Sequence, residues 1–158
     1  MAYSILLVDD EQYTLDGYRR QLNKYFDVQT AINGYDGLKL LKNYGPFSVV
    51  LVDYMMPGMN GIDFTVHARQ AAPETVRLML TGKGDFQVAT EALNKGNIFQ
   101  FLSKPCSADN LLNAVITAVE KYRGSDFIND QDSTEQLNGL KHLYKGILLW
   151  SKGQTRQA

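Results

Sequence analysis

The stretch "SILLVDDEQ", Ser4–Gln12, sets the interpretation of the whole chain. Its four consecutive apolar residues, Ile5–Val8, are typical of a strand buried on both faces, as in a parallel sheet. The strand runs directly into Asp9, Asp10 and Glu11. Because burying unpaired charge is costly, these acids are expected at the rim of the core, where their charge can be offset.

The composition narrows the class of protein. A chain of 158 residues is long enough for one domain and a short extension. Its formal net charge of -1 offers no broad attraction for nucleic acid or an anionic membrane, so we expect direct binding to neither. The single cysteine, Cys106, excludes an intrachain disulfide and a cysteine-rich zinc cluster. No apolar run approaches the length of a membrane span and Met1–Ser4 lacks signal-peptide features, which indicates a cytoplasmic location.

Short apolar runs alternate with amphipathic stretches along residues 1–124. Apolar strands joined by helical crossovers favour an α/β domain with a doubly wound parallel sheet that helices cover on both faces. We expect five strands in the flavodoxin-like order 2-1-3-4-5. The expected strands are Ile5–Val8, Val28–Ile32, Ser48–Asp53, Val76–Leu80 and Phe99–Leu102. The expected helices are one marked by Leu15, Tyr18, Leu22 and Tyr25, then Gly34–Tyr44, Ile62–Ala71, Phe86–Lys95 and Asp109–Arg123.

The end of the chain reads as a linker followed by one more helix. Residues 125–133 are polar and rich in turn formers, and Ser133 and Gln136 have the spacing of a capping box. The predicted helix, 134–151, carries apolar residues on one side, among them Leu140 and Ile147. It could connect to an output domain, dock on its own domain, form a dimer or fray in solution.

Several polar side chains fall at strand ends that share one edge of the predicted sheet. Asp9 and Asp10 follow the first strand and Asp53 ends the third, so the order 2-1-3-4-5 brings three carboxylates together. Each like-charge pair at about 4 Å costs on the order of 4 kcal/mol at intermediate dielectric, and a divalent cation would offset this. Oxygen ligands favour Mg²⁺.

Thr81 and Lys104 follow the fourth and fifth strands at the same edge. A hydroxyl and an ammonium facing a metal-bound carboxylate form a receptor for a phosphoryl group, and an aspartate can itself be the nucleophile. Asp53 is the best candidate because it ends the middle strand in front of a turn-rich loop. Taken singly, each of these residues also fits a helix cap, a turn or a solvated charge.

The joint pattern of Asp9, Asp10, Asp53, Thr81 and Lys104-Pro105, with "DYMMPGMNG" at Asp53–Gly61, resembles the receiver domain of two-component response regulators over roughly residues 3–123. The resemblance implies that Asp53 accepts a phosphoryl group from a histidine kinase or phosphotransfer protein. It implies Mg²⁺ held by Asp10, Asp53 and the Met55 carbonyl, with Asp9 acting through water. Thr81 and Lys104 would hold the phosphoryl oxygens, and the peptide before Pro105 would be cis. Such a domain catalyses only its own phosphorylation and dephosphorylation.

The resemblance also assigns a switch. Phosphorylation would draw Thr81 inward, and Phe101, three residues before Lys104, would turn into the vacated space. Phe101 has no hydroxyl, so packing alone would set its rotamer, unless it is only a packed strand residue. Met55 and Lys83, two positions beyond Asp53 and Thr81, border the path of an attacking water. Because Met55 cannot orient that water, we expect slow self-dephosphorylation.

Two other functions use a similar pocket. Haloacid-dehalogenase-type phosphatases place a second aspartate two residues after the nucleophile, where this chain has Met55. A receiver-like domain that works without phosphate is disfavoured because no pocket residue is missing.

The sequence says less about which output domain or downstream protein the receiver would control. "LTGKGDFQVATEALNKGNIFQFLSKP", which begins at Leu80, is similar to receivers that precede HD-GYP or related output domains. The expected surface for an output domain or a downstream protein is the fourth helix, fifth strand and fifth helix, including Asn94, Lys95, Gln100 and Phe101. A homodimer could use this surface or the tail around Leu140 and Ile147.

Overall fold

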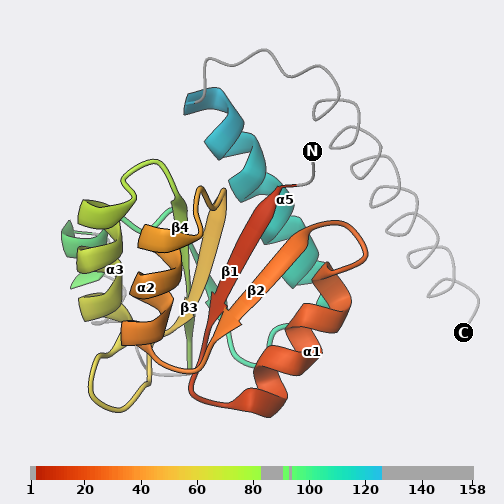
Figure 1. The fold of residues 1–158 in the computed structure, drawn as a ribbon. Coiled ribbons are helices and arrows are strands. Elements are labelled where there is room, and N and C mark those ends of the chain that lie inside the picture. The colour runs from red at the N-terminus through yellow and green to blue at the C-terminus, as the bar shows by residue number, and fades with distance from the viewer. Residues whose placement is uncertain (1–2, 83–90, 93, 126–158) are drawn as a thin grey trace, which may run out of the picture. The chain divides into compact units, whose positions relative to one another are not determined.

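The computed structural model describes residues 3–82, 91–92 and 94–125, which form a layered α/β fold around one parallel sheet (Figure 1). The five strands follow the order β2-β1-β3-β4-β5, with every neighbouring pair parallel, so the predicted topology is confirmed. The strands are β1 (Ser4–Val8), β2 (Asp27–Ala31), β3 (Val49–Asp53), β4 (Val76–Thr81) and β5 (Gln100–Ser103). Most of the strand ends differ from the predicted ends by one residue.

The helices are α1 (Gln12–Leu22), α2 (Gly34–Asn43), α3 (Gly61–Ala71) and α5 (Ala108–Ser125). The first ends earlier than its periodicity predicts, because the Tyr25 N–H donates to the Leu22 carbonyl in a turn instead of continuing the helix. Of the predicted helix Phe86–Lys95, residues 91–92 and 94–95 are described, and they are helical together with Gly96. Residues 83–90 and 93 and the predicted tail helix 134–151 lie outside the described residues. In the described chain, no helix combines the length and apolarity that a membrane crossing requires.

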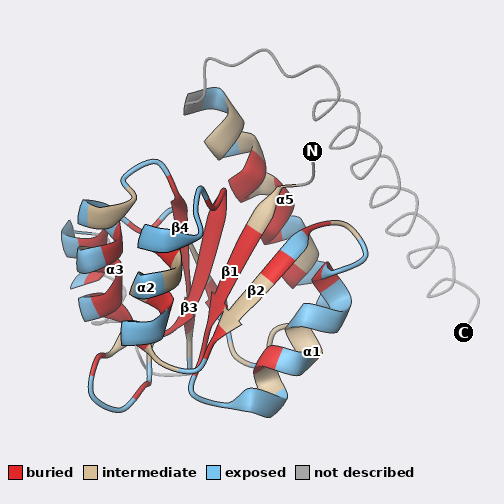
Figure 2. Cartoon of the chain, viewed as in Figure 1, coloured by how far each residue is buried: buried red, intermediate tan, exposed pale blue. Residues whose placement is uncertain are grey.

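The core explains the order of the strands. Ile5, Leu6, Leu7 and Val8 are at most 1% exposed, and β3 is buried along its whole length (Figure 2). Helices α1 and α5 pack on one face of the sheet, and α2 and α3 pack on the other (Figure 1). Strands covered on both faces gain from continuous apolar sequence, and β1 and β3 each carry four apolar residues in a row.

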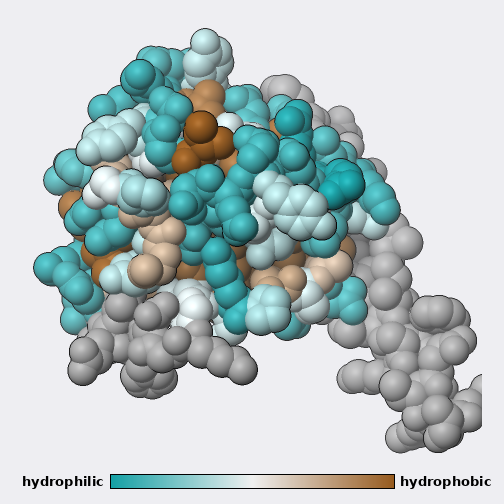
Figure 3. Space-filling model, turned by 90° about the horizontal axis from the view of Figure 1, so that it is seen from below, coloured by the Kyte–Doolittle hydropathy of each residue, from teal (hydrophilic) through white to brown (hydrophobic). Residues whose placement is uncertain are grey.

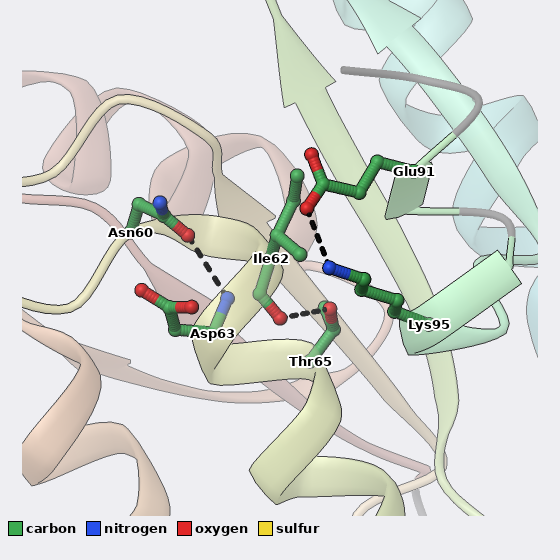
Figure 4. A network of polar contacts seen from close by, with 6 residues as sticks. All are labelled: Asn60, Ile62, Asp63, Thr65, Glu91 and Lys95. Carbon is green, nitrogen blue, oxygen red and sulfur yellow. Dashed lines mark hydrogen bonds and ion pairs between the residues drawn. The ribbon is translucent and has the colours of Figure 1, made fainter. Parts of the chain in front are cut away.

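The helix starts show how polar residues are used near the carboxyl edge of the sheet. The Asn33 and Asn60 side chains accept hydrogen bonds from the Asp36 and Asp63 N–H groups, at 2.8 and 2.9 Å, and so cap α2 and α3 (Figure 4 shows Asn60). Helix α1 begins after Glu11, whose side chain makes no capping bond. Of these three helix starts, only those of α2 and α3 use a side-chain capping bond.

Gly61 fixes the loop between β3 and α3. Its N–H donates to the Tyr54 carbonyl at 2.9 Å, and a β-carbon at this position would lie 2.6 Å from the Asp53 carbonyl oxygen. Both neighbours are main-chain atoms of the segment that carries Asp53, so they cannot move aside without displacing that residue. The turn-rich sequence after Asp53 thus returns the chain tightly across the end of β3.

We predict that Gly61→Ala lowers the free energy of unfolding by about 1–3 kcal/mol, because the added methyl group overpacks against main chain. Gly17→Ala is the matched control: Gly17 lies inside α1, and a β-carbon added there would meet no atom within 4 Å, so alanine should stabilise by about 0.5–1 kcal/mol. Urea unfolding followed by circular dichroism measures both. Equal effects of the two substitutions would contradict the proposed close approach.

Candidate functional site

Three aspartates meet at the carboxyl ends of β1 and β3, which are neighbours in the sheet. Asp9 follows β1 and Asp53 ends β3, and they are only 2% and 4% exposed, whereas Asp10 is exposed. One carboxylate oxygen from each residue lies within 4.8 Å of those of the other two. The structure therefore brings together the three acids that the sequence placed at one edge.

Lys104 enters this cluster from the loop after β5. Its Nζ lies 2.8 Å from Asp53 Oδ2 and 3.6 Å from Asp9 Oδ2. Its backbone N–H donates to the Thr81 carbonyl at 2.9 Å, and the Lys104–Pro105 peptide is cis, as expected. Burial alone would lower the pKa of the Lys104 ammonium, but the hydrogen bond and the charge of Asp53 raise it above its ordinary value. Lys104 therefore remains charged against the carboxylates.

Asp9 is the least satisfied member of the cluster. Its Oδ1 accepts a hydrogen bond of 3.0 Å from the Glu11 N–H, which fixes the carboxylate plane. Its Oδ2 is buried without a hydrogen-bond partner, and only the longer ion-pair contact with Lys104 faces it. Burial raises the pKa of the Asp9 carboxyl, the Glu11 hydrogen bond opposes this rise, and the negative charge of Asp53 adds to it.

This arrangement fits a hard divalent cation. A buried, unpartnered carboxylate oxygen costs free energy, and the described cluster sets three carboxylates against the single ammonium of Lys104. The side-chain atoms that the three aspartates offer to a metal are all oxygens, which are the ligand atoms that Mg²⁺ prefers. An exposed Asp10 beside two buried partners leaves one side open to water, which Mg²⁺ usually retains.

The structure describes three of the four other predicted site residues: Thr81, Phe101 and Met55. Thr81 ends β4 and is half-buried. Phe101 on β5 is half-buried, packs against the core that contains Met79, and is the register partner of Met79. Met55, two residues beyond Asp53, is 67% exposed, and Lys83 lies outside the described residues.

One feature beside the site escaped prediction. A cavity of about 470 Å³ lies between α1 and the loop after β5, and Tyr18, Lys104 and Cys106 are among its lining residues. The sequence pattern indicates only that Tyr18 belongs to the helical stripe. Burial raises the pKa of its hydroxyl, and the negative charges of ionised Cys106, Asp9 and Asp53 add to the rise. Burial also raises the pKa of the Cys106 thiol, which makes it a poor nucleophile. Figure 3 views the molecule from below, onto the carboxyl edge of the sheet, and shows a mostly hydrophilic face with scattered apolar patches.

We predict that Mg²⁺ raises the urea midpoint of the wild-type chain, because it offsets the repulsion among the acids. Asp10→Asn should raise the midpoint in EDTA and weaken the apparent Mg²⁺ affinity about tenfold, since it removes one of the three clustered carboxylates. Asp27→Asn is the control, because Asp27 is an exposed acid at the first residue of β2, the opposite edge of the sheet. A full Mg²⁺ response in Asp10→Asn would rule out this site.

Comparison with known proteins agrees with this geometry. The family model for the response regulator receiver domain matches residues 5–116. The hydrogenase transcriptional regulatory protein HoxA of Cupriavidus necator is 36% identical over 117 residues, which cover 74% of this chain and 24% of HoxA. The chain thus spans about a quarter of that relative's length.

Solved structures with the same fold are also similar in sequence. The signal receiver domain of an HD domain-containing protein from Pseudomonas fluorescens superposes with a TM-score of 0.74 at 29% identity, over 78% of this chain and 99% of that one. A chain described as adenylate cyclase from Rhodopirellula baltica gives a TM-score of 0.74 at 40% identity, over 77% and 90% of the two chains. The matched family model, the sheet order and the acid cluster lead to one conclusion: this chain belongs to the response regulator receiver domain family.

Proposed function

We propose that the chain is a phosphorylation-activated switch of a two-component system and that Asp53 is its phosphoacceptor. The observation that carries the proposal is the Lys104 ammonium 2.8 Å from the buried Asp53 carboxylate, inside a cluster of three acids. A nucleophilic carboxylate that already faces a cation can accept a dianionic group without leaving its charge uncompensated.

The chemical step is a phosphoryl transfer. An Asp53 carboxylate oxygen forms a P–O bond as the P–N bond of a phosphohistidine breaks. The electron pair of the broken bond stays on the imidazole nitrogen, which takes up a proton. Lys104 moves its hydrogen bond from Asp53 to a phosphoryl oxygen, and the Thr81 hydroxyl donates to another. In dephosphorylation, a water molecule attacks phosphorus and gives up a proton, the bond to Asp53 breaks, and inorganic phosphate leaves with the Asp53 carboxylate restored.

Asp10, Asp53 and the Met55 carbonyl would hold Mg²⁺, with Asp9 binding through water. The unpartnered Asp9 Oδ2 supports this assignment because a water ligand of the cation would satisfy it. When bound, the cation supplies charge neutralisation for the transferred phosphoryl group. The role of this chain's residues is to fix that charge at the end of β3.

The response would pass from Thr81 to Phe101. Their strands are adjacent, with Thr81 paired to Ser103 and Met79 paired to Phe101. Inward movement of the Thr81 side chain would open space beside the half-buried Phe101 ring. The surface made by the predicted helix Phe86–Lys95, β5 and α5 would then present a changed face to an output domain or a downstream protein.

The partners are proposed at the level of their chemistry. The donor is a histidine kinase or a phosphotransfer protein, since a phosphohistidine must reach Asp53. The output stays open because relatives differ: HoxA is named as a transcriptional regulator, and the Pseudomonas fluorescens receiver belongs to an HD domain-containing protein. We propose residues 1–124 as the receiver, 125–133 as a linker and 134–151 as a connecting or docking helix.

We predict that acetyl phosphate with Mg²⁺ adds one phosphoryl group to the chain, measured by intact mass, and that Asp53→Asn abolishes the addition. Asp27→Asn, an exposed acid on the opposite edge, should be labelled like the wild type. EDTA should prevent labelling. Persistent labelling of Asp53→Asn would sink the proposed phosphoacceptor.

The same preparation distinguishes the proposed switch from the phosphatase alternative, when it is assayed for hydrolysis of a phosphomonoester. A haloacid-dehalogenase-type enzyme would hydrolyse a generic phosphomonoester with repeated turnover. We expect none, because the exposed thioether of Met55 stands where that chemistry needs an acid.

We predict that Met55→Asn shortens the lifetime of the phosphorylated chain, because an amide can orient an attacking water and a thioether cannot. Met55 is 67% exposed, so the substitution should leave the fold unchanged. Loss of the phosphorylated mass after rapid removal of acetyl phosphate gives the rate, and Met55→Leu is the control. An asparagine variant as slow as the leucine variant would refute this role.

A further inference from the structure

Arg77 is a buried arginine inside an apolar strand. It is 5% exposed and lies in "VRLML" on β4, where a charged side chain is rarely buried without a partner. Its Nε donates to the Gly96 carbonyl at 2.9 Å, and its Nη1 donates to the Thr75 carbonyl at 3.0 Å. Burial lowers the pKa of its guanidinium, and the positive charge of Arg69 adds to this. Arg77 therefore uses a buried charge to hold two main-chain carbonyls.

The Gly96 carbonyl, which is the more distant of the two in the sequence, lies at the end of a helical turn. Residues 94–96 are helical, and Asn97 follows with a φ of 51°, in the left-handed region typical of a helix end. Gly96 also packs against α3, because a β-carbon there would overlap the Thr65 hydroxyl. Ala92 and Ile98, on either side of this turn, are buried in the core. Arg77 thus fastens a helix end that is already pressed between α3 and the sheet.

The same face of the sheet carries the proposed switch. Arg77, Met79 and Thr81 alternate along β4, so their side chains share a face. Across the ladder, the Phe99 N–H donates to the Arg77 carbonyl and Met79 pairs with Phe101. One face of β4 therefore joins the Arg77 attachment at its amino end to Thr81 at its carboxyl end.

We infer that Arg77 is a positioning residue of the switch: it anchors the carboxyl end of the helical residues 94–96 to β4. The inference deepens the proposed function and rests on it. Arg77 holds the Gly96 carbonyl, and β5, which carries Phe101, begins four residues later at Gln100. Movement of Thr81 on β4 therefore acts against a start of this segment that is fixed to the same strand. Without the anchor, residues 96–99 can shift together with β4, and the displacement is lost before it reaches Phe101.

The first test needs no phosphate. Amide hydrogen exchange by NMR is compared in wild type, Arg77→Met, Arg77→Lys and Lys95→Met. Lys95→Met is the matched control, because it removes an exposed ion pair with Glu91, 2.9 Å long, on the same helical stretch (Figure 4). We expect exchange of residues 96–99 to accelerate about tenfold in Arg77→Met, less in Arg77→Lys, and not in the control. Equal exchange in all four proteins would overturn the anchor.

The second test measures whether occupation of the phosphorylation site changes the amide exchange of β5. With Mg²⁺ and beryllofluoride, a phosphoryl mimic, the wild type and Lys95→Met should change their exchange at residues 100–103. Both Arg77 variants should be labelled normally by acetyl phosphate, yet Arg77→Met should lose that change and Arg77→Lys should keep part of it. A retained change in Arg77→Met overturns the inference, and the milder Arg77→Lys decides it if Arg77→Met does not fold. A wild type that takes no label refutes the proposed function and the coupling, while the phosphate-free exchange still decides whether the anchor exists.

Discussion

The rest of the structure depends on how negative charge is accommodated where β1 and β3 end. Asp9 and Asp53 are almost fully buried, Asp10 stands beside them, and the Lys104 ammonium bonds Asp53 at 2.8 Å. Repulsion at this spacing favours any event that brings positive charge in. The proposed Mg²⁺ would offset this imbalance, and together with Lys104 it would also offset the negative charge of an incoming phosphoryl group.

The core makes this crowded edge possible. Because β1 and β3 are buried on both faces, the residues that follow them have little freedom to spread apart. Gly61 draws the loop after Asp53 tightly over the end of β3, with its N–H on the Tyr54 carbonyl. Burial of the two strands therefore holds the like charges at a fixed spacing. Acids carried on flexible loops alone would move apart.

The sequence predicts the sheet well because β1 and β3 each carry four apolar residues in a row. It predicts the acid cluster because parallel strands end at one edge. It does not predict that Tyr25 lies beyond α1, since helical spacing continues past the turn at Leu22. It also hides Arg77, because one charged residue does not disturb a strand pattern. The hydrogen-bond acceptor that explains it, Gly96, is set by tertiary structure nineteen residues away.

The difference between a switch and a hydrolase with this nucleophile lies in what surrounds the phosphorylated aspartate. Turnover requires a group that activates water, and the position two residues beyond Asp53 carries the exposed thioether of Met55. Lys104 and the proposed cation would stabilise the charge of the phosphoryl group in the bound state as well as in its transfer. A site that stabilises the product and leaves water unassisted would retain the phosphoryl group long enough for a proposed movement of Thr81 to be sensed elsewhere.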